Sequence, residues 1–159
     1  MLSGLIRTMR PRQWFKNVFV FAPLIFDEKL DVPLYLGQTI AGFLLLCLTS
    51  GTVYIINDLA DIEKDRNHPK KRYRPLAAGE LGMRTATVAA FAIPLIVLPL
   101  GFLLDPIMGV ILTGYLAVQI GYSFWLKDIV IIDVMIVASG FLLRVAAGVP
   151  LVEAERFSP

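Results

Sequence analysis

Residues Asn57 to Gly79 read NDLADIEKDRNHPKKRYRPLAAG, a charged stretch that follows the apolar run LCLTSGTVYII. The first half carries Asn57, Asp58, Asp61 and Asp65 in the pattern N-D-x-x-D-x-x-x-D. If this part continues the preceding helix at about 100° per residue, the three aspartates fall within roughly 60° of one another, with Asn57 about 40° beyond Asp61. One helix face is therefore predicted to carry three carboxylates and an amide.

Repulsion within this face predicts that a cation binds there, because like charges three and four residues apart destabilise a helix. Mg²⁺ binds through carboxylate oxygens and completes its shell with water and phosphate oxygens. A cluster without acidic residues follows, formed by Arg66, Lys70, Lys71, Arg72 and Arg74. This order suits a ligand with a diphosphate and a further phosphate. Alternatively, the aspartates form a solvated helix end without a ligand, and the basic residues only set the orientation of the chain in the membrane.

The composition indicates a membrane protein. Of the 159 residues, 57% are hydrophobic, and the mean hydropathy is +0.70, which is high for a soluble domain. The single cysteine, Cys47, excludes an intrachain disulfide and is predicted to be a packing residue. One short basic cluster is not the footprint of a nucleic-acid-binding protein, so we expect no nucleic-acid partner.

The hydrophobic pattern predicts an all-α, polytopic transmembrane helix bundle of about five helices, forming a single domain over residues 1–159. The first span is short, and we expect its helix to begin near Arg10 to Arg12. Residues 57–84 then form a polar connection between the second and third spans. The expected spans are Trp14 to Phe26, Leu34 to Ile56, Thr85 to Leu104, Ile107 to Leu126 and Ile129 to Val152.

The fifth span contains two ionisable residues, Asp133 and Arg144. Helical geometry places them about 20° apart around the axis and about 16 Å apart along it, so they share a face without pairing. Ionisable residues inside a membrane are typical of helices that line a polar cavity. Proline in the third span, at Pro94 and Pro99, predicts a kink there.

The distribution of basic residues predicts the orientation. Lysine and arginine gather in the N-terminal segment, in residues 57–84 and, as Lys127, between the fourth and fifth spans. All three segments lie on one side of a five-span chain. We therefore expect a multi-pass protein of the inner or plasma membrane whose N-terminus and loop 57–84 face the cytoplasm.

The aspartate pattern after a membrane helix, followed by R-P-L-x-x-G at Arg74 to Gly79, resembles the UbiA-type superfamily of intramembrane prenyltransferases. Several further stretches look like its decaprenyl-phosphate phosphoribosyltransferase branch: DRNHPKK at Asp65 to Lys71, RPRQWFKN at Arg10 to Asn17, Tyr122-Ser123 with Leu126-Lys127, Asp133-Val134, and GFLLR at Gly140 to Arg144. The family implies a nine-helix bundle with a second acidic motif in later helices. We therefore expect this chain to be the N-terminal part of such a bundle.

The resemblance implies an Mg²⁺-dependent transferase that moves 5-phosphoribose from phosphoribosyl diphosphate to polyprenyl phosphate and supplies cell-wall arabinan precursors. In that reading Asp58 and Asp61 hold the metal, Asn57 and Asp65 assist them, and the three aspartates form the catalytic set. The candidates for substrate binding are Asn57, Lys16, Arg66, Lys70, Lys71, Arg74, Lys127, Asp133 and Arg144. The expected partners are the two substrates and the lipid bilayer, and an oligomer is left open.

Two other functions fit the same pattern. An aromatic or quinone-precursor prenyltransferase would use the same metal chemistry with the lipid as donor. A membrane transporter or scaffold is an alternative of another class, although aspartates at the membrane boundary favour surface chemistry over an ion path at the bilayer midplane.

Overall fold

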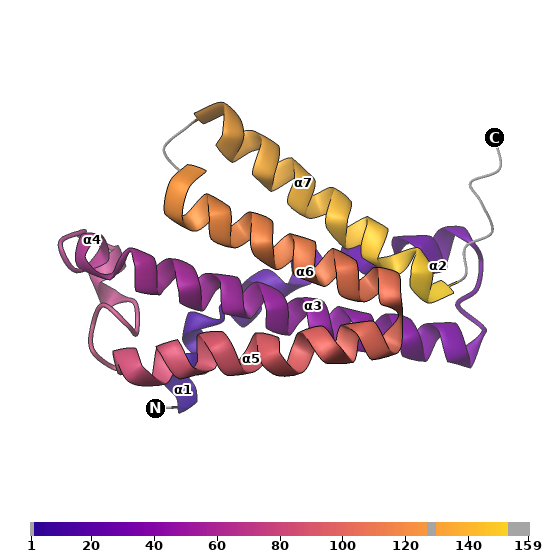
Figure 1. Cartoon of the computed structure of the whole chain (residues 1–159), viewed down its shortest axis with the longest axis horizontal. Coiled ribbons are helices and arrows are strands. Elements are labelled where there is room, and N and C mark those ends of the chain that lie inside the picture. The colour runs from indigo at the N-terminus through magenta and orange to yellow at the C-terminus, as the bar shows by residue number, and fades with distance from the viewer. Residues whose placement is uncertain (1, 127–129, 153–159) are drawn as a thin grey trace.

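The structure, a computed structural model, describes residues 2–126 and 130–152. Every element within these ranges is a helix (Figure 1), which confirms the predicted all-α class. The elements are α1 (Leu2–Thr8), the 3₁₀ helix η1 (Pro11–Phe21), α2 (Ala22–Phe26), α3 (Pro33–Ala60), α4 (Ile62–Arg66), η2 (Lys71–Tyr73), α5 (Met83–Leu104), α6 (Pro106–Gly121), the π-helical turn η3 (Tyr122–Leu126), α7 (Val130–Gly148) and η4 (Pro150–Val152).

Four helical stretches in the described residues are long and apolar enough to cross a bilayer: 33–60, 83–104, 106–124 and 134–152. They correspond to the second to fifth expected spans. The first expected span is helical but differs from an ordinary transmembrane helix, because η1 and α2 together cover only residues 11–26 and η1 is a 3₁₀ helix. At roughly 2.0 Å per residue in η1 and 1.5 Å in α2, this segment is about 30 Å long, which matches the hydrocarbon thickness.

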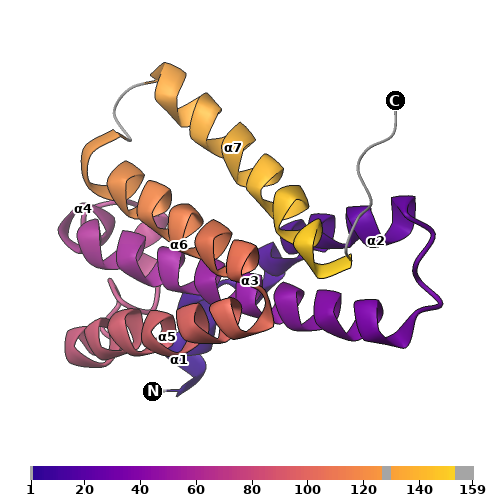
Figure 2. The same cartoon turned by 45° about the vertical axis from the view of Figure 1, so that its right-hand side comes forward.

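Helix α3 is the central element of the bundle, and α5 and α6 pack beside it (Figure 1). Helix α7 lies along α6 and meets η1 and α2 at its C-terminal end, which the turned view shows from the side (Figure 2). Pro94 and Pro99, where a kink was predicted, both lie inside α5, which continues through them. The first and last spans are in direct contact, because η1 packs against both α3 and α7.

The connection between α3 and α5 folds back onto the bundle. Leu76 and Leu81 are 2% and 1% exposed and join a core cluster with Met9, Ile55 and Ala86. Burying a leucine side chain contributes on the order of 2 kcal/mol, so two such anchors hold this loop in place. The N-terminal helix is tied to the same loop by an ion pair between Arg7 Nη1 and Glu80 Oε2 at 2.6 Å.

The tight turn between α5 and α6 is built on Asp105, whose carboxylate Oδ1 accepts hydrogen bonds from Ile107 N at 2.7 Å and Met108 N at 3.0 Å. Replacing an N-cap aspartate by alanine costs about 1 kcal/mol. We expect Asp105→Ala to lower the unfolding temperature of the purified protein by roughly 2–4 °C. Differential scanning fluorimetry checks this, with the exposed Asp31→Ala as the matched control. An unchanged unfolding temperature for Asp105→Ala would show that the cap is dispensable.

Candidate functional site

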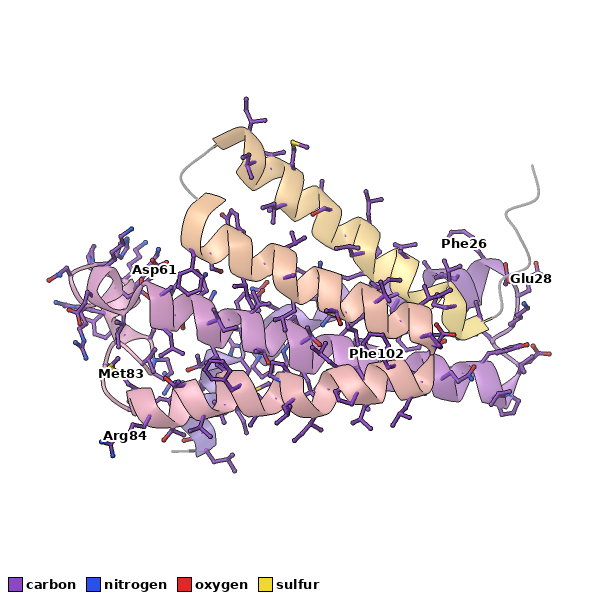
Figure 3. The ribbon with its side chains drawn as sticks, viewed as in Figure 1. Phe26, Glu28, Asp61, Met83, Arg84 and Phe102 are labelled. Atoms are coloured by element: carbon purple, nitrogen blue, oxygen red, sulfur yellow. The ribbon has the colours of Figure 1, made fainter. Side chains whose placement is uncertain are left out.

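The predicted acidic face lies at one end of the bundle, and the chain bends within it. Figure 3 shows Asp61 at the same end as Met83 and Arg84, opposite Phe26 and Glu28. Helix α3 ends at Ala60, and Asp61 adopts a non-helical conformation (φ −104°, ψ 10°) before α4 begins. The expectation of one uninterrupted helix through Asp65 is therefore wrong. The hydrogen bond from Asp65 N to Asp61 O, at 2.8 Å, still carries the chain around the corner.

Asp58 and Asp65 are both buried, at 3% and 2% exposure, although they lie on different helices. Arg74 joins them, because its Nη1 donates to Asp65 Oδ2 at 2.6 Å and to Asp58 Oδ1 at 3.1 Å. The aspartates were predicted to surround a cation, and in this structure a guanidinium of the chain itself lies between two of them. Asp61 and Asn57 are half-buried at the same end of α3.

A second arginine completes the network from the N-terminal segment. Arg10 Nη2 donates to Asp58 Oδ1 at 2.6 Å, and the guanidinium carbon lies 4.6 Å from the centre of the Tyr54 ring. Arg10 has a positive φ of 53°, a conformation that non-glycine residues adopt mainly where surrounding contacts hold them. We call Arg10, Asp58, Arg74 and Asp65 the charge network. Sequence reasoning did not place Arg10 among the site residues, although it begins the stretch Arg10 to Asn17 that carries part of the resemblance.

The remaining basic residues of the loop point outward. Arg66, Lys70 and Lys71 are exposed, and Arg66 Nη1 pairs with Glu63 Oε1 at 2.8 Å. The turn that presents them is capped by His68, whose Nδ1 accepts from the backbone N–H groups of Lys70 and Lys71, both at 3.2 Å. The loop therefore offers cations at the surface around a buried network.

Lys16 from the first span and Arg144 from the last, both predicted binding residues, line one small cavity of about 130 Å³ that Tyr54 also borders. Arg144 is 9% exposed, and Lys16 is half-buried. Lys127 lies outside the described residues, and the side chain of Asp133 is likewise outside the description. The structure thus divides the predicted binding residues between the charge network, the loop surface and this cavity.

The carboxylates of the charge network are donors of the type that Mg²⁺ prefers. Within residues 2–126 and 130–152, no three side chains of the His, Cys, Asp and Glu types are placed to enclose a metal ion. Two buried carboxylates nevertheless already hold a positive charge here. A carboxylate has about four acceptor positions, so Asp58 and Asp65 keep acceptor capacity beyond their arginine contacts. The oxygen donors are therefore of the type that binds a divalent cation, while in this structure arginine side chains contact both carboxylates.

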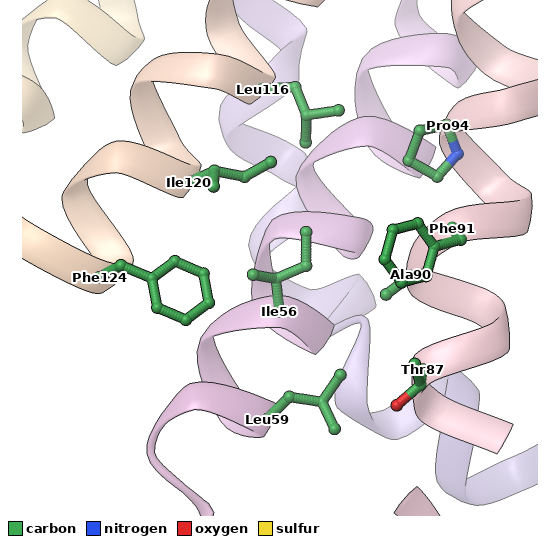
Figure 4. Close-up of a pocket in the computed structure, with 9 residues that line it drawn as sticks. All are labelled: Ile56, Leu59, Thr87, Ala90, Phe91, Pro94, Leu116, Ile120 and Phe124. Carbon is green, nitrogen blue, oxygen red and sulfur yellow. The ribbon is translucent and has the colours of Figure 1, made fainter. Parts of the chain in front are cut away.

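A larger groove of about 400 Å³ lies between α3, α5 and α6 (Figure 4). Helical periodicity places its α3 residues, Ile56 and Leu59, on a different face from Asp58. The lining is apolar apart from Thr87, so the groove suits a hydrocarbon chain and not a phosphate. The lining residues are Ile56, Leu59, Thr87, Ala90, Phe91, Pro94, Leu116, Ile120 and Phe124.

Fold and site together define a polytopic integral membrane protein whose apolar helices end in a buried network of aspartate and arginine. The chain belongs to the UbiA prenyltransferase family, which its residues 18–156 match. The resemblance predicted from the aspartate motif is thereby confirmed.

Three relatives belong to the predicted branch, and each is described as a decaprenyl-phosphate phosphoribosyltransferase. The protein from Mycolicibacterium smegmatis is 39% identical over 155 residues, covering 93% of this chain and 48% of the relative. The Corynebacterium glutamicum protein is 37% identical, over 92% of this chain and 45% of its own length. The Mycobacterium tuberculosis protein is 35% identical, over 93% and 50%. The chain spans about half the length of these curated relatives.

Proposed function

We propose that this chain forms the donor-binding part of a transferase that moves 5-phosphoribose from phosphoribosyl diphosphate to a polyprenyl phosphate. The observation that carries the proposal is the charge network at the end of apolar helices, where Arg74 bridges Asp58 and Asp65 at 3.1 and 2.6 Å. The names of the relatives support the same reaction. The lipid product would supply arabinan precursors of the cell wall.

The reaction exchanges one oxygen nucleophile for another at C1 of the ribose. The bond from C1 to the diphosphate breaks, the diphosphate leaves with the electron pair, and an oxygen of the acceptor phosphate forms the new bond to C1. Positive charge develops on the ribose and negative charge on the departing oxygens. Because the acceptor is already an anion, no general base is required, and the main tasks of the protein are alignment and charge stabilisation.

The residues at this end of the bundle divide those tasks. When bound, Mg²⁺ would be held by Asp58, Asp61, Asn57 and Asp65 and would neutralise the diphosphate as it leaves. Arg10 and Arg74 orient the carboxylates through their hydrogen bonds and would donate to diphosphate oxygens when the donor binds. Arg66, Lys70 and Lys71 lie at the loop surface, where they would attract the multiply charged donor.

This assignment includes an orientation, because the donor is a water-soluble metabolite. We propose that the N-terminus and residues 57–84 face the cytoplasm, as the excess of lysine and arginine at that end indicates. The aspartates then meet the donor from the cytoplasmic side while the apolar helices contact the lipid acceptor.

The full-length protein in lipid nanodiscs, given labelled phosphoribosyl diphosphate, Mg²⁺ and decaprenyl phosphate, tests the proposal. Label in the lipid fraction is the expected result. A parallel reaction with a labelled polyprenyl diphosphate and an aromatic acid tests the aromatic prenyltransferase alternative. Label in the aromatic product with none in the polyprenyl phosphate would overturn the proposal in favour of that alternative. Ion flux without any transfer would indicate a transporter.

Arg74→Lys keeps the positive charge but removes the planar guanidinium that contacts both carboxylates. We expect the rate of phosphoribose transfer to fall about 100-fold, which corresponds to about 2.7 kcal/mol of transition-state stabilisation. Steady-state assays of the full-length protein measure this, with the exposed Arg84→Lys as the control that keeps wild-type activity. If Arg74→Lys stays within threefold of wild type, only the charge at position 74 matters and the bridging geometry does not.

A further inference from the structure

The small cavity lies at the junction of four helical elements that are distant in the sequence. Lys16 comes from η1, Ser50 and Tyr54 from α3, Tyr115 and Gln119 from α6, and Arg144 from α7. All but η1 belong to stretches that qualify as membrane spans. Apolar side chains of the same helices complete its lining. Its volume of about 130 Å³ is room for several water-sized groups.

The lining of this cavity is positively charged. Lys16 and Arg144 both border it, and among the described residues its lining contains no aspartate or glutamate. The side chain of Asp133 lies outside the description, and eleven residues of helix separate its backbone from Arg144 by about 16 Å. A buried charge is costly unless an opposite charge or hydrogen bonds compensate it. Two cations facing one cavity therefore favour an anion between them.

The guanidinium of Arg144 is held in place by neutral groups. Its Nε donates to Asn17 Oδ1 at 2.8 Å, its Nη1 to Gly140 O at 2.6 Å and its Nη2 to Tyr115 OH at 3.1 Å. These bonds use three of the five N–H groups of an arginine. The guanidinium therefore has two further N–H groups beyond these three bonds, and Arg144 is one of the residues that line the cavity. A donor pair with fixed orientation is the arrangement that recognises a phosphate oxygen pair.

Asn17 and Gly140 explain why the guanidinium stays in that position. Asn17 is 1% exposed, and its Nδ2 donates to Ser50 Oγ at 3.2 Å and to Cys47 Sγ at 3.3 Å. A Cβ atom at Gly140 would lie 3.0 Å from Arg144 Nη1, so a larger residue would push the guanidinium away. The arginine is thus pre-organised by the packing of η1, α3 and α7.

Tyr54 connects the cavity to the charge network. It lines the cavity, and its ring stacks on Arg10 at 4.6 Å. Ser50, Tyr54 and Asp58 are spaced four residues apart on α3, so they form one stripe on the same face of the helix. The stripe runs from the carboxylates at the end of the bundle into the membrane span. A ligand in the cavity is therefore a neighbour of a ligand at Asp58.

We infer that this cavity is a phosphate-binding site, in which Lys16 and Arg144 hold a phosphate monoester beside the charge network. The inference rests on the proposed function for the source of that phosphate, which is either the polyprenyl phosphate acceptor or the 5-phosphate of the donor. The phosphate chemistry is the same in both cases. Arg144 contributes fixed N–H donors, and Lys16 contributes a flexible ammonium at the side of η1.

The test uses the full-length protein in nanodiscs and two separate readouts. Thermal unfolding in the presence of octyl phosphate gives a dissociation constant that does not depend on turnover. Steady-state kinetics gives KM for decaprenyl phosphate and for phosphoribosyl diphosphate. The variants are Lys16→Gln and Arg144→Gln, and the matched controls are the exposed residues in Lys64→Gln and Arg84→Gln.

We expect Lys16→Gln to weaken octyl phosphate binding about tenfold, because one charge-assisted hydrogen bond is lost. We expect the KM of one substrate to rise by a similar factor with kcat within threefold of wild type, as loss of uniform binding predicts. A higher KM for decaprenyl phosphate would show that the cavity binds the acceptor phosphate. A higher KM for phosphoribosyl diphosphate would show that it binds the 5-phosphate of the donor. Both controls should behave as wild type.

Unchanged octyl phosphate binding and unchanged KM values in Lys16→Gln would overturn the inference, even if Arg144→Gln fails to fold. A wild-type protein that turns over neither substrate contradicts the proposed function instead. The octyl phosphate measurement then still decides whether the cavity binds phosphate, so the two failures are distinguishable.

Discussion

Asp58→Asn should reduce the proposed phosphoribose transfer by the full-length protein by about 1,000-fold or more. Asp58 is the one residue of the charge network that contacts both Arg10 and Arg74, at 2.6 and 3.1 Å. The amide keeps the shape of the side chain but removes the negative charge. The variant loses a proposed metal ligand and leaves two arginines without their shared counter-ion. Each loss acts on the transition state, where charge on the diphosphate is greatest.

A second variant separates catalysis from folding. Breaking a buried ion pair on one side costs about 3 kcal/mol, so Asp58→Asn alone is also expected to lower the unfolding temperature. Asp58→Asn combined with Arg10→Gln removes both partners of that pair and should recover part of this stability without recovering activity. The exposed Asp31→Asn is the control for the chemical change. An Asp58→Asn protein with more than a tenth of wild-type activity would contradict the proposed role.

Gly148→Ala is expected to have the largest effect on stability. A Cβ atom at Gly148 would overlap the carbonyl oxygen of Val20 and would lie 3.0 Å from Pro23 Cδ. The obstacle is the backbone of η1, which cannot rotate away as a side chain can. Helix α7 and η1 would have to separate, and overpacking of this kind costs about 3 kcal/mol. We expect the unfolding temperature to fall by roughly 5–10 °C.

Separating α7 from η1 should also disturb the small cavity that Lys16 and Arg144 line. Arg144 lies one turn before Gly148 and donates a hydrogen bond to Asn17, 127 positions away in the sequence. We therefore expect Gly148→Ala to weaken octyl phosphate binding as well. Gly114→Ala is the control, because nothing lies within 4 Å of a Cβ atom at Gly114 and alanine favours a helix. Equal unfolding temperatures for the two variants would mean that α7 and η1 are not in close contact.

The membrane-spanning helices were predictable because each depends on residues next to one another in the chain. The run Leu34 to Ile56 is free of charge, and α3 covers all of it. The 3₁₀ conformation of η1 was not predictable, since its apolar content is that of any short helix. The interruption of the aspartate face at Asp61 was missed for a similar reason. Periodicity describes a regular helix and does not locate a bend within it.

The candidate site was predictable in its residue types and not in its contacts. The spacing of the aspartates predicted a shared cation, but nothing in the motif indicated that Arg74 would lie between Asp58 and Asp65. That position depends on Leu76 and Leu81, whose burial folds the loop back against α3 and α5. Arg10 reaches Asp58 across 48 positions because the segment before η1 packs beside α3.

By itself, the sequence determined that the chain enters a membrane, where four of its spans lie, and that an acidic and a basic segment meet at one boundary. These properties are sums of local transfer free energies and local charge, which neighbouring residues set. Only the tertiary structure decided which charges pair, which cations face the cavity and where η1 meets α7. Such contacts join residues far apart in the chain, and they exist only because the packing of several helices at once brings them together.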